Sequence, residues 1–187
     1  MPETTRALLV PRTTAIGIVG FAIALALASQ VAIPIPGTPV PITLQPLLVV
    51  LAGLWLGPRA GAASMALYLA AGAAGLPVFA PIGAAGLLRL VGPTGGYLLA
   101  YPIAAFVAGW LGQRSTSFVT RAAAAAAGIL ALYVGGIAQL TLLTGSLERA
   151  ALLGVLPFAA LDAVKAVVAA LVSPAASAAR ESRSGRA

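Results

Sequence analysis

The sequence contains neither cysteine nor histidine among its 187 residues. Without cysteine the chain forms no disulfide, no thiolate nucleophile and no sulfur metal site. Without histidine it has no imidazole ligand, no imidazole proton shuttle and no Ser-His catalytic pair. Only four carboxylates are present (Glu3, Glu148, Asp162 and Glu181), and they lie far apart in the sequence, so a metal site built from several of them is hard to form. We therefore predict no metal, no cofactor and no catalytic residue.

Charged residues of either sign are also scarce, at 8% of the chain, whereas an average soluble domain has about 25%. Four uncharged segments have lengths of 46, 29, 24 and 26 residues; they are 13–58, 60–88, 90–113 and 122–147. Each is longer than the ~20 residues that cross a bilayer, and a soluble fold would expose much of this apolar surface. The sequence predicts a multi-pass protein of the cell membrane, in contact with the lipid bilayer. The net charge of +7 does not indicate a nucleic-acid partner, because no soluble domain presents it.

Glycine and proline, with 21 and 14 copies, divide the apolar sequence into helices. Residues 77–92 are too rich in both to form a full span and are expected to be a connection. The predicted fold is all-α, a bundle of six transmembrane helices in one membrane domain over residues 1–187, with tails at 1–12 and 175–187. The expected spans cover residues 13–32, 43–56, 60–76, 93–111, 121–143 and 152–172.

The positions of the arginines predict the orientation, because cytoplasmic loops carry an excess of basic residues. With the N-terminus in the cytoplasm, six crossings leave only Arg89 and Arg149 outside. Both termini are then cytoplasmic, and eight arginines lie inside: Arg6, Arg12, Arg59, Arg114, Arg121, Arg180, Arg183 and Arg186. An alternative is a signal peptide cleaved near Ala26-Leu27-Ala28. Cleavage there would leave five spans and an external N-terminus, which disagrees with this distribution of charge.

Asp162 and Lys165 are the strongest functional signal in the sequence. Lys165 is the only lysine, Asp162 is the only acid within an expected span, and their i,i+3 spacing places them on one helix face. Ionisable residues inside a membrane are costly and usually mark function. With Pro157 in the first turn of the helix, Asp162 is expected ~7–8 Å below the outer surface at ~1.5 Å per residue. The alternative is a structural ion pair that joins the helix to a neighbour.

Arg89 is expected on the outer side, where the positive-inside rule disfavours it. A guanidinium binds a carboxylate with two hydrogen bonds, so an anionic group of a ligand is a natural partner. An arginine that reaches toward the lipid headgroups is the alternative explanation.

The proline-rich segment 33–44 is uncharged and could cover an outward-facing pocket as a lid. Near the outer ends of the expected spans lie Thr43, Gln45, Tyr68 and Phe79. Their amide, hydroxyl and aromatic groups are typical of a mostly apolar ligand site, although capping or packing roles are the alternative for each.

Small residues one turn apart in the first span, Ala22 with Ala26 and Ala24 with Ala28, allow a neighbouring helix to approach closely. They are candidate contacts for a partner protein. In a chain this rich in alanine, such pairs also arise by chance.

Five segments in order resemble the BioY family of biotin-transporter substrate-binding proteins, the substrate-specific (S) components of energy-coupling factor (ECF) transporters. The segments are Ile-Pro-Gly-Thr-Pro-Val-Pro-Ile-Thr-Leu-Gln at 35–45, Gly-Leu-Trp-Leu-Gly-Pro-Arg-Ala-Gly at 53–61, Gly-Leu-Pro-Val-Phe-Ala at 75–80, Gly-Pro-Thr-Gly-Gly-Tyr at 92–97, and the pair Asp162/Lys165. The resemblance covers residues 15–173. One departure is the segment 156–161, Leu-Pro-Phe-Ala-Ala-Leu, where a glycine is expected near the start of the last helix.

The resemblance implies a six-helix membrane bundle with an outward-facing pocket for biotin. Asp162 would accept a hydrogen bond from a ureido N–H group, Lys165 would donate at the same polar end, and Arg89 would pair with the valerate carboxylate, although the two ends could be reversed. The small-residue faces of the first helix would dock on the transmembrane (T) component. Two cytoplasmic ATPases joined to that component would supply energy while the S component reorients in the membrane.

Other functions remain open at this point. An intramembrane enzyme would need a metal, a histidine dyad or a Ser-Lys pair, and no serine lies near Lys165 on its helix. An autonomous or proton-coupled transporter could use Asp162 and Lys165 as a relay, although no inverted repeat is evident. The same scaffold could also bind another small vitamin.

Overall fold

The computed structural model describes residues 12–173, and within them all regular structure is helical apart from one isolated β-bridge. Eight helices follow one another along this part of the chain. They are α1 Arg12–Ser29, α2 Gln45–Leu56, α3 Pro58–Ala73, α4 Leu87–Val91, α5 Gly95–Gly112, α6 Phe118–Thr144, α7 Leu147–Gly154 and α8 Ala159–Val172.

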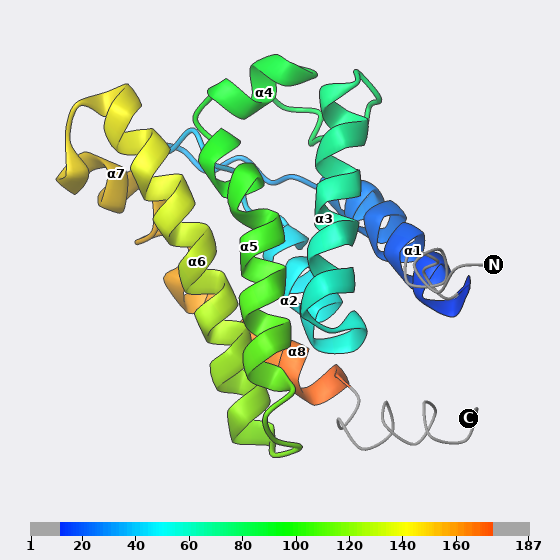
Figure 1. Ribbon diagram of the computed structural model, residues 1–187. Coiled ribbons are helices and arrows are strands. Elements are labelled where there is room, and N and C mark those ends of the chain that lie inside the picture. Colours follow the sequence, from blue (N-terminus) through cyan, green and yellow to red (C-terminus); the bar gives the residue numbers. More distant parts are fainter. Residues whose placement is uncertain (1–11, 174–187) are drawn as a thin grey trace.

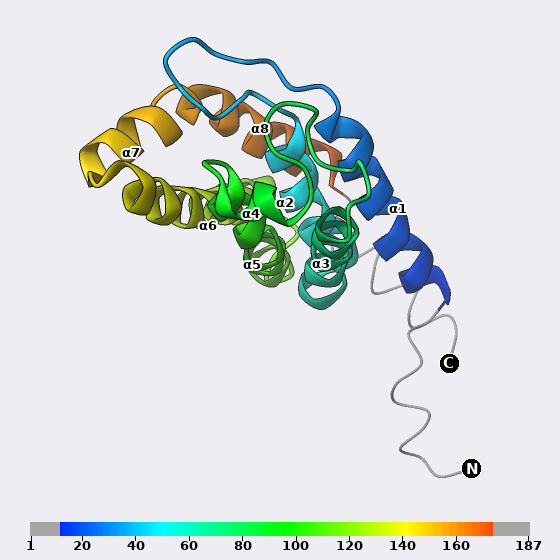
Figure 2. The ribbon, with the colours of Figure 1, turned by 90° about the horizontal axis from the view of Figure 1, so that it is seen from above.

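The helices form a bundle in which α5 packs against α2, α3 and α6 (Figure 1). Helix α1 packs on α2 and α3, and α8 packs on α2 and α6. The long connections gather at one end of the bundle, which we call the loop end and define as residues 30–44, 74–94 and 145–158. Figure 2 looks onto this end, where the α1–α2 connection and α4 lie above the longer helices.

Glycine allows α5 to approach two of its neighbours at backbone distance. A Cβ atom at Gly96 would overlap the carbonyl oxygen of Gly135 in α6, and one at Gly53 in α2 would overlap the carbonyl oxygen of Ala105. Such close packing is the usual source of helix association in lipid, where hydrophobic burial between helices contributes little. These contacts fix the positions of α2, α5 and α6 relative to one another.

The predicted helix boundaries agree with the structure to within a few residues for five of the six expected spans. Ser117 caps the N-terminus of α6 by accepting a hydrogen bond from the Thr120 backbone N–H, and Gly145 ends α6 with φ of 69°. Helix α3 ends earlier than expected: Gly75, with φ of 94°, follows its last turn. Pro77, the first residue after the expected span 60–76, lies beyond that turn.

The last expected span, 152–172, is wrong as a single helix. Helices α7 and α8 are bent by 56° about a break at residues 155–158. Pro157 lies in this break and not in the first turn of a helix. Because proline has no N–H group, it can interrupt the backbone hydrogen-bond ladder at this point. As a consequence, Asp162 lies in the first turn of α8.

Three helices within residues 12–173 are long and apolar enough to cross a membrane, namely α1, α5 and α6, and α7 with α8 adds a fourth if the bent pair counts as one span. Helix α2 is apolar but has only 12 residues, about 18 Å at 1.5 Å per residue. The tails predicted at 1–12 and 175–187 lie outside the described residues except for Arg12.

Candidate functional site

A polar pocket opens at the loop end between α2, α5, α6 and α8. The space within it is about 680 Å³, including the part that is open at the mouth. The lining combines aromatic and aliphatic side chains with a few polar groups, which is typical of a small-molecule site. The lining residues are Val40, Pro41, Thr43, Gln45, Pro46, Phe79, Ala80, Arg89, Thr94, Tyr97, Leu98, Tyr101, Leu132, Tyr133, Gly154, Phe158, Asp162 and Lys165.

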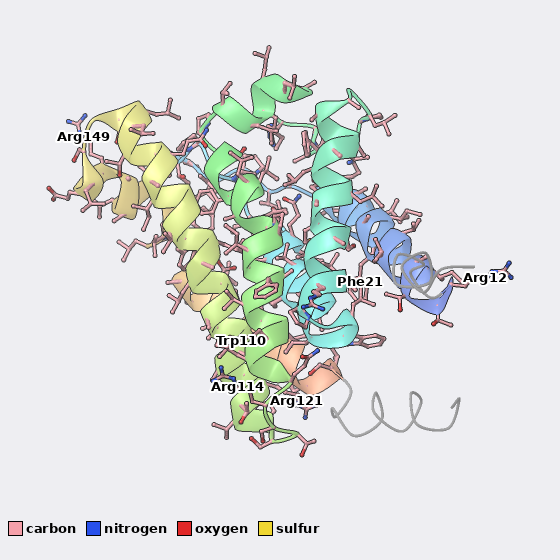
Figure 3. The ribbon with its side chains drawn as sticks, viewed as in Figure 1. Arg12, Phe21, Trp110, Arg114, Arg121 and Arg149 are labelled. Atoms are coloured by element: carbon pink, nitrogen blue, oxygen red, sulfur yellow. The ribbon has the colours of Figure 1, made fainter. Side chains whose placement is uncertain are left out.

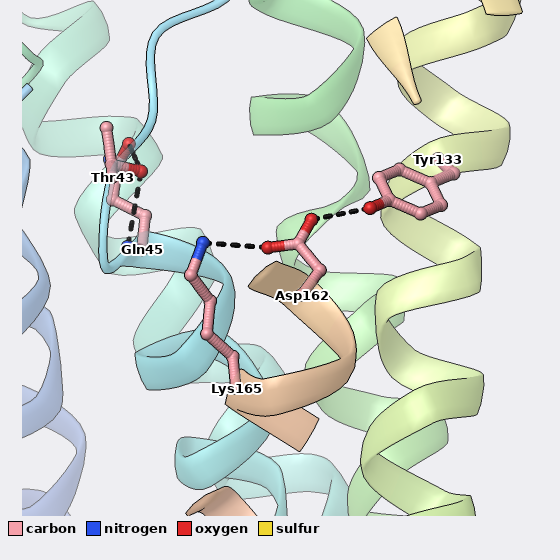
Figure 4. Close-up of polar contacts among 5 residues, drawn as sticks. All are labelled: Thr43, Gln45, Tyr133, Asp162 and Lys165. Atoms are coloured by element: carbon pink, nitrogen blue, oxygen red, sulfur yellow. Dashed lines mark hydrogen bonds and ion pairs between the residues drawn. The ribbon is translucent and has the colours of Figure 1, made fainter. Parts of the chain in front are cut away.

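Asp162 and Lys165 form an ion pair in the wall of this pocket. The Lys165 Nζ atom donates to Asp162 Oδ1 at 2.7 Å, and the Tyr133 hydroxyl donates to Oδ2 at 2.6 Å. Figure 4 shows the lysine and the tyrosine reaching the carboxylate from opposite sides. The carboxylate is therefore held by its own helix on one side and by α6 on the other.

The surroundings of Asp162 provide partners for a carboxylate at this position. Its location in the first turn of α8 brings it near the positive end of the helix dipole. The residue is only 4% exposed, so its hydrogen bonds replace the water that a carboxylate otherwise requires.

Arg89 reaches the pocket from α4, the five-residue helix in the connection between α3 and α5. The residue is 7% exposed, and its Nη1 group donates to the carbonyl oxygen of Ile82. A Cβ atom at Gly83 would lie 2.7 Å from Nη1, so a glycine there gives the guanidinium room. Burial lowers the pKa of Arg89, with Tyr68 and Tyr101 acting in the opposite direction, yet an arginine remains charged in proteins.

Arg89 has no acidic partner among residues 12–173, where the one recorded salt bridge joins Asp162 and Lys165. The guanidinium is thus a buried cation that lines the pocket without a compensating carboxylate. Because a buried charge is costly unless it is paired, the arrangement favours an anionic group in the pocket beside Arg89.

Thr43, Gln45 and Tyr68 form a chain of hydrogen bonds from the pocket wall into the core. The Thr43 hydroxyl donates to Gln45 Oε1 at 3.2 Å, and Gln45 Nε2 donates to the Tyr68 hydroxyl at 2.9 Å. Thr43 and Gln45 line the pocket, whereas Tyr68 is 1% exposed and lies behind the lining. Of the seven predicted ligand-binding residues, the structure brings six together around one pocket and places Tyr68 as their support.

Phe79 lines the pocket from the connection after α3. Its ring packs edge-on against Tyr68, with centroids 5.4 Å apart, and covers Gly72, where a Cβ atom would overlap the ring. The Ser29 hydroxyl at the end of α1 donates to the carbonyl oxygen of Val78 at 2.6 Å. These contacts fasten the connection that carries Phe79 to two helices.

The segment predicted as a lid is an ordered loop in the structure. Ile33 and Ile42 exchange two backbone hydrogen bonds of 2.9 Å, and Gly37 turns the chain between them with φ of 87°. The Thr38 hydroxyl donates to the carbonyl oxygen of Leu153 at 2.6 Å. Val40, Pro41 and Thr43 of this loop form part of the pocket lining.

Three tyrosines of the lining, at positions 97, 101 and 133, were not predicted as site residues. Tyr97 donates to the carbonyl oxygen of Gly154 at 2.6 Å, and Tyr101 stacks on Tyr68 with ring centroids 6.2 Å apart. These tyrosines can be noticed in the sequence because each lies within an otherwise apolar span, where its hydroxyl group needs a hydrogen-bond partner. That signal does not indicate which helix face they occupy.

The four alanines predicted to contact a partner occupy two different faces of α1. Ala22 is 7% exposed and belongs to the core, with Ala26 packed against the same cluster. Ala22 is therefore not available to a partner, because it already packs inside the bundle. Ala24 and Ala28 are half-buried and flank the outer face of α1.

Basic and aromatic residues gather at the end opposite the pocket. The Arg114 guanidinium lies 3.9 Å from the centroid of the Trp110 ring, and Arg121 donates to the carbonyl oxygen of Ser173. Figure 3 shows Trp110, Arg114 and Arg121 at this end, whereas Arg149 lies on α7 at the other end.

An all-helical bundle with apolar helices of spanning length and a polar pocket between them defines a multi-pass membrane protein with a small-molecule site. The sequence matches the BioY family over residues 3–182. The chain therefore belongs to the BioY family.

Curated relatives support this assignment over most of the chain. A protein of Pyrococcus horikoshii named probable biotin transporter BioY is 40% identical over 135 residues, which are 72% of this chain and 79% of the relative. The biotin transporter BioY of Thermotoga maritima is 38% identical over 141 residues, 75% of this chain and 83% of the relative. The biotin transporter BioY of Rhizobium etli is 38% identical over 148 residues, 73% and 78% of the two chains.

A solved structure has the same fold. It is the S-component for biotin from an ECF-type ABC transporter, which superposes with a TM-score of 0.79 and covers 92% of each chain. At 24% sequence identity, this similarity is evidence for the fold alone.

Proposed function

We propose that this chain binds biotin in the pocket and takes it up across the cell membrane as the S component of an ECF-type transporter. Three curated relatives are named as biotin transporters or probable ones. The observation that carries the proposal is the pocket itself, which combines an Asp162–Lys165 pair with a buried arginine that has no acidic partner within the described residues 12–173.

The chemistry of biotin matches these two groups. Its ureido ring offers N–H donors and a carbonyl acceptor, for which Asp162 can accept and Lys165 can donate. Its valerate carboxylate suits Arg89, because a guanidinium can bind a carboxylate with two hydrogen bonds. The apolar thioether ring suits the aromatic lining between them. The reverse placement of the two ends remains the competing assignment.

Transport in this proposal involves binding and delivery without covalent chemistry. The T component and two ATPase subunits would be the partners, with Ala24 and Ala28 as candidate contacts on the accessible side of α1. The chain would cross the membrane six times, with α2, α3 and the bent α7–α8 pair among the spans and both termini in the cytoplasm.

Calorimetric titration of biotin into the purified full-length protein in detergent tests the substrate. We expect tight one-to-one binding, with thiamine and riboflavin giving no heat as control vitamins. Absence of heat with biotin would contradict the substrate assignment. Uptake of labelled biotin into vesicles with and without the T component and ATPases then separates an ECF mechanism from an autonomous or proton-coupled one.

The orientation can be tested with single cysteines, because the natural chain has none. Thr116→Cys lies in the connection between α5 and α6, and Glu148→Cys lies on α7; both positions are exposed. A membrane-impermeant maleimide should label Glu148→Cys in intact cells and Thr116→Cys only after permeabilisation. The opposite result would invert the proposed topology.

A further inference from the structure

The contact between Tyr133 and Asp162 joins two helices at the polar wall of the pocket. Tyr133 comes from the middle of α6, and Asp162 comes from the first turn of α8. The O–O distance of 2.6 Å is in the short range typical of a hydroxyl that donates to a carboxylate. The tyrosine ring also lines the pocket.

Tyr133 restrains the carboxylate in a way that Lys165 does not. The terminal torsion of an aspartate is broad, and a lysine is a flexible chain that can follow the carboxylate as it rotates. Lys165 also lies on the same helix as Asp162, one turn away. The tyrosine hydroxyl is attached to a rigid ring on a different helix, so it defines the orientation of the carboxylate plane.

The two contacts leave part of the carboxylate free. An ionised carboxylate has about four lone-pair sites, and Lys165 and Tyr133 occupy one on each oxygen. The others remain as acceptors for a ligand. A carboxylate whose plane is held before binding loses less conformational entropy when the ligand arrives.

We propose that Tyr133 is a positioning residue of the ligand site, which orients the Asp162 carboxylate so that its free lone pairs accept N–H donors of the ligand. This inference rests on the proposed function, because the donors are those of the ureido ring. Tyr133 acts through Asp162 in this role.

Asp162 is the only aspartate in the sequence, so aspartate labelled with ¹³C at the carboxyl carbon gives a single reporter at the site. The experiment records the carboxyl resonance of the full-length, ligand-free protein in detergent for the natural chain and for Tyr133→Phe. Tyr97→Phe is the matched control, because it also removes a hydroxyl of the pocket lining with a 2.6 Å hydrogen bond, but one that reaches the Gly154 carbonyl oxygen. Each protein is then titrated with biotin.

We expect Tyr133→Phe to shift or broaden the labelled resonance and Tyr97→Phe to change it less. Biotin affinity of Tyr133→Phe should fall roughly 3- to 10-fold, the contribution of one hydrogen bond. Site-specific 3-fluorotyrosine at position 133 serves as a second variant that preserves the shape. Its phenol is a stronger donor, so the resonance should move in the direction opposite to that of Tyr133→Phe.

Two results would overturn the inference while the proposed function stands. One is a labelled resonance that Tyr133→Phe and fluorotyrosine leave unchanged, which would mean that the contact does not hold the carboxylate. The other is a shifted resonance with biotin affinity unchanged, which would mean that the contact is structural. If the natural chain binds no biotin, the proposed function fails and the inference fails with it.

Discussion

The pocket has two charged regions, and they are built in opposite ways. Asp162 and Lys165 lie on one helix, neutralise each other and gain a third contact from Tyr133. Arg89 lies on a five-residue helix within a loop and has no acidic partner among residues 12–173. The charges of the first region balance each other without a ligand, whereas the second has an uncompensated charge that an anionic ligand can satisfy.

This difference indicates that the two regions contribute to a ligand site by different routes. The paired groups recognise a ligand by geometry, because the donors and acceptors of the ligand must fit the fixed directions of the paired side chains. A single cation recognises it mainly by charge. Changes in the first region should therefore affect both stability and binding, and changes in the second should affect binding much more than stability.

The largest effect is expected when the ion pair loses one partner. Lys165→Met leaves the Asp162 carboxylate buried without its cation, which typically costs about 3–5 kcal/mol in stability. Thermal unfolding should show this loss, and biotin binding should fall below detection. The double variant Asp162→Asn/Lys165→Met is the control, because it should regain most of the stability without regaining binding. Equal stability of the natural chain and Lys165→Met would contradict a buried pair.

Arg89→Ala should weaken biotin binding by about 1.5–3 kcal/mol, the usual range for a hydrogen bond to a charged group, with a much smaller change in thermal stability. The natural chain should prefer biotin to its uncharged methyl ester, and Arg89→Ala should lose this preference. Arg89→Lys keeps the charge without the two-pronged geometry and should fall between them. An Arg89→Ala protein that still prefers the acid would place the carboxylate elsewhere, with Lys165 as the next cation to test.

Substitutions at two glycines compare a contact between helices α5 and α6 with a contact between α3 and the loop residue Phe79. A Cβ atom at Gly96 in α5 would meet the backbone of Gly135 and the Gln139 side chain, whereas the atoms nearest to a Cβ at Gly72 belong to the Phe79 ring. Overpacking usually costs 1–3 kcal/mol, so we expect Gly96→Ala near the upper limit of about 3 and Gly72→Ala near about 1 kcal/mol. Thermal unfolding of both variants checks the order, and a reversed order would show that the loop is the stiffer wall.

The smallest effect should follow from Thr38→Val, which removes the hydroxyl bonded to the Leu153 carbonyl oxygen without changing side-chain volume greatly. One hydrogen bond of this kind contributes about 0.5–1.5 kcal/mol. Stopped-flow displacement of biotin should show dissociation several times faster than in the natural chain. An unchanged dissociation rate would mean that loop 33–44 does not retain the ligand.

The sequence allowed the helical class and most helix boundaries to be predicted, because uncharged segments divided by glycine and proline have few other structures open to them. It also indicated part of the pocket lining: six of the seven predicted ligand-binding residues line the pocket, the five polar ones among them being Thr43, Gln45, Arg89, Asp162 and Lys165. Such residues can be recognised in the sequence, because a charge or an amide within or beside an apolar span requires a partner or a cavity.

Other features depended on three-dimensional packing. The break between α7 and α8 was not predicted, because Pro157 is compatible with the first turn of a helix as well as with an interruption. The contact between Tyr133 and Asp162 was missed because it depends on the rotation of α6 about its axis, which its alanine-rich sequence does not reveal. The burial of Ala22 depended in the same way on the rotation of α1.

The charge of Arg89, which no acid among residues 12–173 pairs with, also sets the net charge of the pocket. Its lining carries two cations and one anion, Arg89, Lys165 and Asp162, so its net charge is one positive unit, and a bound monocarboxylate brings it to zero. One elementary charge moved across 100 mV corresponds to about 2.3 kcal/mol. If the pocket itself crosses the membrane field during transport, the three charged groups of its lining together with a bound monocarboxylate cross without net electrical work. The membrane potential would then act on the positive unit of the empty pocket.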